Sequence, residues 1–224
     1  MKKSYTFLKP LVLSGFLLSL LSGNAFAQRS ETLKIEAESA DALYDTYHYD
    51  STINKGTITV EAQKDPDDPN AGVVNSCWNT NFVLYKNVDF GSEATKIRIR
   101  KHAVRGYKVE YWIDQTPTPK DSKGVTNRRG GTKIGEYVFA EPASGVWTRW
   151  GTHEATIETP ISGIHDLYLV FANAGGTATN QNLAGYNWIE IDKTIIDITA
   201  ISNTQSEVSL LTNMTKNLDY QLSP

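Results

Sequence analysis

Residues 95–113 read TKIRIRKHAVRGYKVEYWI, and this stretch decides the fold class. Apolar and charged residues alternate in KIRIR (96–100) and again in KVEYW (108–112). A period of two places alternate side chains on opposite faces of a β-strand, so each segment predicts a strand with one solvated face. The stretch therefore indicates antiparallel β-structure.

Further strand-like segments lie on both sides of this stretch. They are rich in β-branched and aromatic residues and are separated by Gly, Asn, Asp and Pro, as expected of strands joined by turns. The segments are 33–39, 56–62, 81–88, 133–139, 166–172 and 186–192. One connection is a long polar loop, 115–132. Many short strands with turns between them predict an all-β fold of the β-sandwich or jelly-roll type.

The N-terminus has the pattern of a secretory signal peptide. Three lysines and an apolar run at 11–21 come first, and the small residues Ala25 and Ala27 then fit a cleavage site. We expect residues 1–27 to be removed and the protein to be secreted, either extracellular or periplasmic. The apolar run is too short to span a bilayer, which disfavours the alternative of an uncleaved anchor.

The remaining chain predicts one domain with an appendage. Residues 28–193 form the β-sandwich module, and residues 194–224 are a C-terminal extension or linker, or the start of a further domain. Loss of three lysines with the signal peptide changes the formal net charge from −3 to −6. An acidic surface argues against nucleic acid or a membrane as the partner. Cys77 is the only cysteine, so no internal disulfide is expected.

Catalytic motifs are missing from the sequence. It contains no H-E-x-x-H metal motif, no G-x-S-x-G nucleophile motif and no phosphate-binding loop. Acids are plentiful, but none stands out as one of the two facing carboxylates that glycoside hydrolysis needs. We expect a non-catalytic protein. The alternative is a glycoside hydrolase or polysaccharide lyase built on the same sandwich.

Two tryptophans are candidates for a carbohydrate site. Trp78 (NSCWNTN) and Trp147 (ASGVWTRW) lie in polar or glycine-bearing surroundings, where a strand starts or ends. An indole at a loop edge offers a flat apolar face that matches the C–H face of a sugar ring. The alternative for each is an ordinary core residue.

Two pairs of acids are candidates for a Ca²⁺ site. Glu36 and Glu38 lie two residues apart on one predicted strand, and Glu190 and Asp192 do so on another, so each pair shares a strand face. Ca²⁺ takes several carboxylate and carbonyl oxygens. If the first and last strands are neighbours, these acids would hold one ion between them. The alternative is a solvated charged face.

Seven segments in order resemble one known family. They are IEAES (35–39), FVLYKNVDFG (82–91), KVEYWID (108–114), GTKIGEY (131–137), SGVWTRW (144–150), SGIHDLYLVF (162–171) and NWIEID (187–192). Together they resemble the family 6 carbohydrate-binding modules and, more loosely, the family 35 and 36 modules. The resemblance runs from about Lys34 to Asp192.

The resemblance implies a β-sandwich jelly roll with a structural Ca²⁺, usually attached to a polysaccharide-degrading enzyme. Carried onto this sequence, the calcium ligands are Glu36, Glu38 and Asp192. It also implies a sugar cleft among the loops at one end of the sandwich. Trp147 is its stacking Trp, and the hydrogen-bonding Asn is Asn187, with Tyr186 or Asn182 as alternatives.

The sequence departs from the family at the second stacking residue. Ser76 stands where the family often has Tyr, and Trp78, of the same strand parity, can replace the lost ring. A second family site, on the concave sheet face, would use Phe82. The resulting expectation is a module that binds a polysaccharide or oligosaccharide and accompanies a glycoside hydrolase domain. The alternative is an adhesive or structural domain with a degenerate sugar site.

Overall fold

The alternating stretch 95–113 forms two strands that belong to different sheets. In the computed structural model, Ile97 and Ile99 of β6 (Glu93–Ala103) face a buried core, as do Val109 and Tyr111 of β7 (Tyr107–Ile113). Charged residues between them lie on the outer faces. The structure describes residues 27–46, 58–62, 65–103, 106–122, 126–140, 150–174 and 182–197. All of these lie within one unit, Ala27–Asp197.

Thirteen strands and one short 3₁₀ helix make up the described residues. They are β1 (Ala27–Glu36), η1 (Ala37–Ser39), β2 (Ala42–Tyr44), β3 (Thr59–Glu61), β4 (Val73–Trp78), β5 (Phe82–Asp89), β6 (Glu93–Ala103), β7 (Tyr107–Ile113), β8 (Thr116–Pro117), β9 (Arg128–Arg129), β10 (Thr132–Phe139), β11 (Gly151–Ile161), β12 (Ile164–Asn173) and β13 (Asn182–Asp197).

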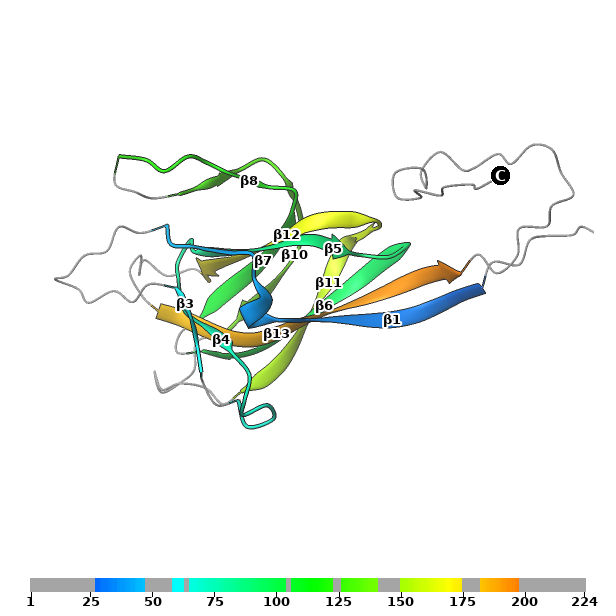
Figure 1. Cartoon of the computed structure of the whole chain (residues 1–224), viewed down its shortest axis with the longest axis horizontal. Helices are drawn as coiled ribbons and strands as arrows, with labels where there is room; N and C mark the ends of the chain where they lie inside the picture. The colour runs from blue at the N-terminus through cyan, green and yellow to red at the C-terminus, as the bar shows by residue number, and fades with distance from the viewer. Residues whose placement is uncertain are drawn as a thin grey trace, which may run out of the picture. The chain divides into compact units, whose positions relative to one another are not determined.

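The strands form two antiparallel sheets packed face to face (Figure 1). Sheet A has the order β11-β6-β13-β4-β3, and β1 pairs with the later part of β13. Sheet B has the order β10-β7-β12-β5-β2. The predicted long loop contains the small β8–β9 hairpin. The fold is therefore an all-β sandwich of the jelly-roll type, as the sequence predicts.

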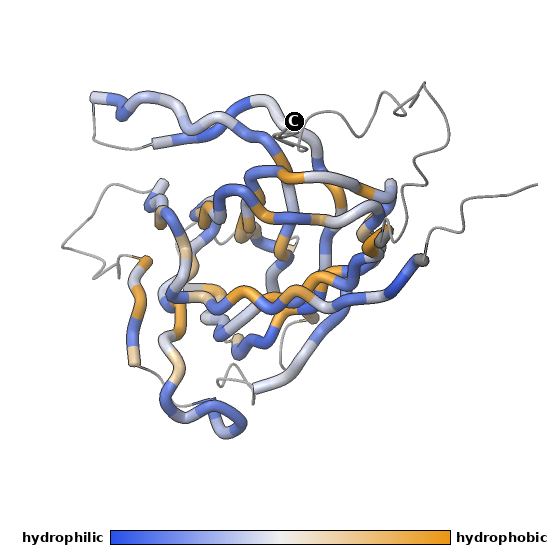
Figure 2. Tube along the Cα trace, turned by 45° about the vertical axis from the view of Figure 1, so that its right-hand side comes forward, coloured by the Kyte–Doolittle hydropathy of each residue, from blue (hydrophilic) through white to orange (hydrophobic). Residues whose placement is uncertain are grey.

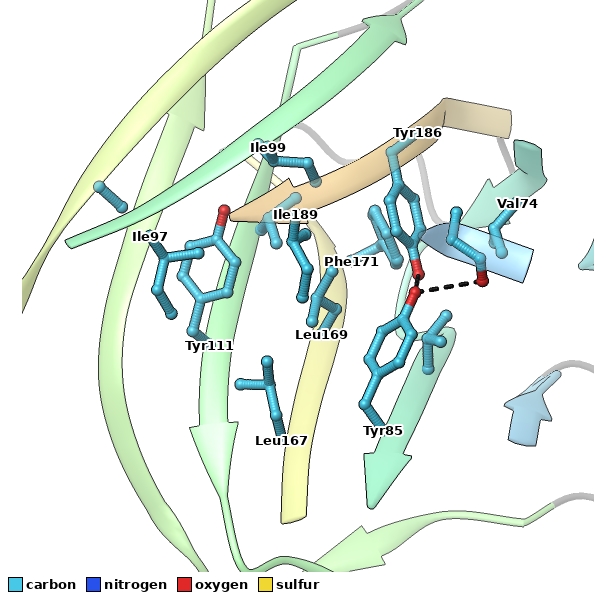
Figure 3. Close-up of a cluster of buried hydrophobic side chains, with 14 of the residues drawn as sticks. Val74, Tyr85, Ile97, Ile99, Tyr111, Leu167, Leu169, Phe171, Tyr186 and Ile189 are labelled. Atoms are coloured by element: carbon cyan, nitrogen blue, oxygen red, sulfur yellow. Dashed lines mark hydrogen bonds between the residues drawn. The ribbon is translucent and has the colours of Figure 1, made fainter. Parts of the chain in front are cut away.

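The core lies between the inner faces of the sheets and consists mainly of aliphatic and aromatic side chains (Figure 3). The hydroxyls of Tyr85 and Tyr186 share a hydrogen bond of 2.7 Å, and Tyr85 also donates to the carbonyl of Ala37 at 3.2 Å. These bonds satisfy polar atoms that would otherwise be costly to bury. Cys77 lies in the same core, where burial raises the pKa of its thiol and keeps it protonated.

Two of the longer strands, β4 and β11, have no counterpart among the segments predicted from sequence, and neither do the short strands β2, β8 and β9. In β11, only Ala155 and Ile157 are buried, because β11 is an edge strand with a solvated outer face, and that position also tolerates Pro160. In β4, a bulge interrupts the alternation. Hydrophilic and hydrophobic residues alternate along strands with one solvated face, as the tube in Figure 2 shows, whereas β5 and β12 contain continuous buried runs.

The boundaries of the module differ slightly from the prediction. Residues 194–197 continue β13 and pair with the start of β1, with Asp197 opposite Ala27. The predicted signal segment up to residue 26 and the tail from residue 198 lie outside the described residues. No helix among the residues that the structure describes is long and apolar enough to cross a membrane.

Candidate functional site

One end of the sandwich gathers the connections in which the sequence predicts a sugar site. There β4, β6, β10 and β12 end, and β5, β7, β11 and β13 begin. We call this end the loop end. The register confirms the arrangement, with Trp78 opposite Asn182 and Tyr107 opposite both Phe139 and Asn173. Trp147 lies outside the described residues, in the segment 141–149 that connects β10 to β11.

Trp78 is the last residue of β4 and lies at the loop end. Its side chain is half-buried, and the buried indole Nε1 has no hydrogen-bond partner within the described ranges. Two hydrogen bonds fix the turn that follows. The backbone N–H of Asn81 donates to the Trp78 carbonyl at 3.0 Å, and the backbone N–H of Asn173 donates to Asn79 Oδ1 at 2.9 Å. Trp78 thus combines a partly exposed ring, an unused donor and a fixed backbone, which suits stacking on a sugar.

Ser76 lies in a bulge of β4. Its φ is +57°, in the left-handed region. Val74 and Cys77, three residues apart, both belong to the core, so the alternation shifts between them. Because the shift lies between Val74 and Cys77, it leaves the shared parity of Ser76 and Trp78 as a prediction. Trp78 reaches the loop end because it terminates β4, independently of Ser76.

Tyr186 and Asn187 do not lie at the sugar site, which corrects the prediction for both. Each has an exposed fraction of 0%. Tyr186 points into the core, where it meets Tyr85 (Figure 3). Because β13 begins at Asn182, four positions earlier than the sequence pattern suggests, both residues lie within the strand. Tyr186 faces the core between the sheets, whereas Asn187 is buried on the other side of the strand, against Asp65. Asn182, the alternative residue, begins the strand opposite Trp78.

Phe82 is also buried, with 0% exposure, and its ring is not available to a sugar. It stacks on Tyr44, with ring centroids 4.4 Å apart and planes 15° apart. Arg128 of β9 lies 5.8 Å from the Phe82 ring centroid. Phe82 belongs to a second cluster, on the outer face of sheet B, with Leu84, Tyr168 and Val170. The second family site is therefore covered at Phe82.

The three predicted calcium ligands are not brought together. Thr32 pairs with Asp192 and Glu36 pairs with Trp188, so the two acids are separated by about 13 Å along the strands. Both carboxylate oxygens of Asp192 accept from Arg98, at 2.6 and 2.7 Å. Within the described ranges, no group of three or more His, Cys, Asp or Glu side chains is placed to hold a metal. Asp192 therefore does not fit the predicted ligand set.

Glu36 and Glu38 remain compatible with a cation. Glu36 Oε1 pairs with Lys34 at 2.6 Å, but Oε2 is buried and accepts no hydrogen bond from the described residues. A buried carboxylate oxygen without a donor is costly unless a cation or water meets it. Glu38 is exposed in η1, and one of its oxygens accepts from the Gly72 amide at 3.3 Å.

The side chain of Asn187 is held by a buried ion pair that was not predicted from the sequence. Asp65 has an exposed fraction of 0% and accepts from Arg100 at 2.9 and 2.8 Å and from Asn187 Nδ2 at 3.0 Å. Burial alone would raise the pKa of Asp65, but the hydrogen bonds from Arg100, Asn187 and the Asp67 amide outweigh it and lower the pKa to about 2. The only sequence signal was the run DPDDPNAG (65–72), which predicts a turn.

Comparison with known proteins gives a family and similar structures. The model of the family described as "Carbohydrate binding module (family 6)" matches residues 36–193. No curated protein matches the chain by sequence comparison. Among solved structures, a family 6 module from Clostridium stercorarium in complex with cellobiose is 18% identical, with a TM-score of 0.47, covering 74% of this chain and 92% of that chain.

Two further solved structures have similar identities, TM-scores and coverages. A β-1,3-glucan-binding family 6 module from Bacillus halodurans is 23% identical, with a TM-score of 0.49, covering 73% of this chain and 94% of that one. A family 6 module from Clostridium cellulolyticum in complex with xylose is 22% identical, with a TM-score of 0.49, covering 74% and 96%. The family model spans well over half of the sequence, and it begins and ends within the two-sheet sandwich. The chain belongs to the family 6 carbohydrate-binding modules.

Proposed function

We propose that this protein is a secreted, non-catalytic module that binds a polysaccharide or oligosaccharide at the loop end of the sandwich. The family match over residues 36–193 carries the proposal. Trp78, with its half-buried ring at the end of β4, supplies one stacking surface. Trp147 supplies the second, since the segment that holds it connects two strands at the same end.

The sequence supports the non-catalytic and secreted parts of the proposal. No catalytic motif is present, and the N-terminal residues have the order of a signal peptide: basic, apolar, then small. A module of this kind would keep an attached or associated glycoside hydrolase close to its polysaccharide. Stacking on preformed rings costs little side-chain entropy, so a single shallow site should bind with a Kd of about 10 µM to 1 mM.

Substitution of the two tryptophans tests the binding site. We expect Trp78→Ala and Trp147→Ala each to weaken binding about tenfold or more, since each removes a stacking surface worth about 1–2 kcal/mol. Affinity electrophoresis against a panel of polysaccharides, with reducing-end release measured in parallel, provides the readout. Release of reducing ends by the isolated protein would contradict the non-catalytic proposal.

Trp112→Ala is the matched control for these variants. Trp112 lies on the outer face of sheet B, beside the cluster that contains Phe82, and donates to Glu110 at 3.0 Å. We expect this variant to bind as the wild type does. If Trp112→Ala abolishes binding while Trp78→Ala and Trp147→Ala do not, the sugar site lies on the sheet face instead.

We propose further that Ca²⁺ binds at Glu36 and Glu38, without Asp192. The buried, unpartnered Glu36 Oε2 supports this proposal. The ion would neutralise both carboxylates next to the first strand. At a calcium concentration about 100 times the Kd, removal by EDTA should lower the Tm by roughly 5–10 °C.

Two variants separate the calcium site from the Asp192 ion pair. Glu36→Gln should abolish the EDTA-induced shift, whereas Asp192→Asn should keep it, because Asp192 pairs with Arg98. Differential scanning calorimetry of calcium-loaded protein measures both. An unchanged Tm on adding EDTA to wild-type protein of confirmed calcium content would rule out a stabilising ion.

A further inference from the structure

Lys101 occupies a position where the strand pattern requires an apolar residue. Along β6, Ile97 and Ile99 face the core with 0% exposure, and Lys101 is the next residue on the same face, with 5% exposure. It lies near the end of β6, two positions before the last residue of the strand, and His102 follows it. A lysine is therefore buried between the sheets at the loop end.

The ammonium of Lys101 rests on aromatic rings. Its Nζ lies 4.0 Å from the Phe139 ring centroid and 5.8 Å from that of Tyr107, and these two rings stack on each other with centroids 4.4 Å apart. Such contacts stabilise a cation by a modest amount, but they do not supply a counter-ion. Burial lowers the pKa of Lys101 to about 8, so the amine is still mostly protonated at neutral pH.

No carboxylate compensates this charge within the described ranges. The titratable groups that surround Lys101 are Tyr107 of β7, Tyr137 of β10, His153 of β11, Tyr186 of β13 and the adjacent His102. Burial, reinforced by Lys101, lowers the pKa of both histidines, and burial raises that of Tyr107 and Tyr186, so all four groups are uncharged at neutral pH. Among the described residues, Lys101 therefore has no negatively charged group beside it.

An uncompensated buried cation lowers the stability of a fold unless a ligand meets it. Lys101 lies at the loop end, because its neighbours Phe139 and Gly151 are the last residue of β10 and the first residue of β11. We propose that the Lys101 ammonium binds an anionic substituent, a carboxylate or a sulfate, so that the module selects acidic polysaccharides. This inference rests on the proposed sugar-binding function.

The acidic net charge of the protein does not oppose this selection at short range. Screening at physiological salt limits the reach of surface charges to about 8 Å, whereas a direct ion pair with the buried Lys101 ammonium is screened far less. Uronates and sulfate esters both supply such an anion, so the experiment must distinguish them. It must also separate charge recognition from a purely structural cation–π contact.

Two ligand pairs that differ only in charge test the proposal. Polygalacturonate is compared with its methyl ester, and dextran sulfate with dextran, by affinity electrophoresis at pH 6.5. We expect the wild type to bind the charged member of one pair at least tenfold more tightly, and the pair concerned identifies the carboxylate or the sulfate. At pH 9.5 the charged polysaccharide that the wild type prefers should bind less tightly. Lys101 loses its proton at this pH, while the polysaccharide keeps its charge.

Lys101→Met and Lys101→Arg complete the design. Lys101→Met should remove the preference while keeping or raising the Tm, because it replaces a buried charge with an apolar chain of similar length. Lys101→Arg should retain the preference. A preference that survives in Lys101→Met, or equal binding to both members of each pair, overturns the inference and leaves the proposed function standing. Failure of the wild type to bind any charged or neutral glycan overturns both.

Discussion

Replacing Asp65 by alanine is expected to destabilise the protein by about 3–5 kcal/mol, the cost of leaving one half of a buried ion pair without its partner. Asp65 is fully buried and binds Arg100 through two hydrogen bonds, of 2.9 and 2.8 Å. It also accepts from Asn187. The substitution therefore removes two hydrogen bonds from the Arg100 guanidinium, which keeps only the exposed Asp67, and leaves the Asn187 side-chain amide without its acceptor. Urea denaturation followed by tryptophan fluorescence measures the loss.

Asp67→Ala is the matched control for this variant. Asp67 also pairs with Arg100, at 2.6 Å, but its side chain is 75% exposed. An exposed carboxylate is solvated in both states, so its removal should cost less than about 1 kcal/mol. Equal losses for the two variants would mean that burial of Asp65 contributes nothing.

The same carboxylate should make stability depend on pH in the acid range. Because the pKa of Asp65 falls from 3.8 to about 2 on folding, the ionised form stabilises the fold. This stabilisation is fully present above pH 4, and it is lost as the pH falls toward 2, since protonation breaks the pair with Arg100. The shift corresponds to about 2 kcal/mol. A pH series of urea midpoints should show this decline in wild type and a shallower one in Asp65→Ala.

The architecture could be predicted because it depends on local patterns. The alternation around Ile97 and Val109 fixes which side chains face the core, and that information lies within a few residues of sequence. Prediction failed where few residues of a strand are buried. In β11 the edge location leaves only Ala155 and Ile157 buried, so the segment reads as polar.

The candidate site was harder to predict because it depends on where strands begin. Asn187 and Tyr186 look like loop-edge residues in the sequence, yet β13 starts at Asn182 and carries them into the interior. The partner of Asn187 is Asp65, 122 positions away, and only the assembled sheet brings them together. The position of Trp78 at the end of a strand was predictable, because it depends on the polar turn that follows it.

Lys101 shows a different limit of sequence analysis. In KIRIRKHA it resembles one more charged residue of a half-solvated strand, but its parity matches Ile97 and Ile99 and not Arg98 or Arg100. A strict period of two would have placed Lys101 in the core. A charged residue at a strand position that faces the core is therefore a reason to look for a ligand, since burying a charge does not stabilise the core.

Replacing Gly91 by alanine is expected to cost about 3–5 kcal/mol, the range of a strained backbone combined with a steric clash. Gly91 has a φ of +69°, and a Cβ atom would lie 2.3 Å from the carbonyl oxygen of Thr194 in β13. That oxygen accepts two hydrogen bonds from Ser92, at 2.8 and 2.9 Å. Displacement of Thr194 would therefore break both bonds and loosen the central strand of sheet A.

Gly163→Ala isolates the contribution of the backbone conformation alone. Gly163 has a φ of +88°, but a Cβ atom there would meet nothing within 4 Å. Its substitution should cost only about 1–2 kcal/mol, the penalty for a left-handed alanine. Both glycines lie at the end of the sandwich opposite the loop end, so the folded fraction of each variant should bind glycan as the wild type does. Equal urea midpoints for the two variants would show that the Thr194 contact relaxes without cost, whereas lost glycan binding would show that sheet A transmits strain to the loop end.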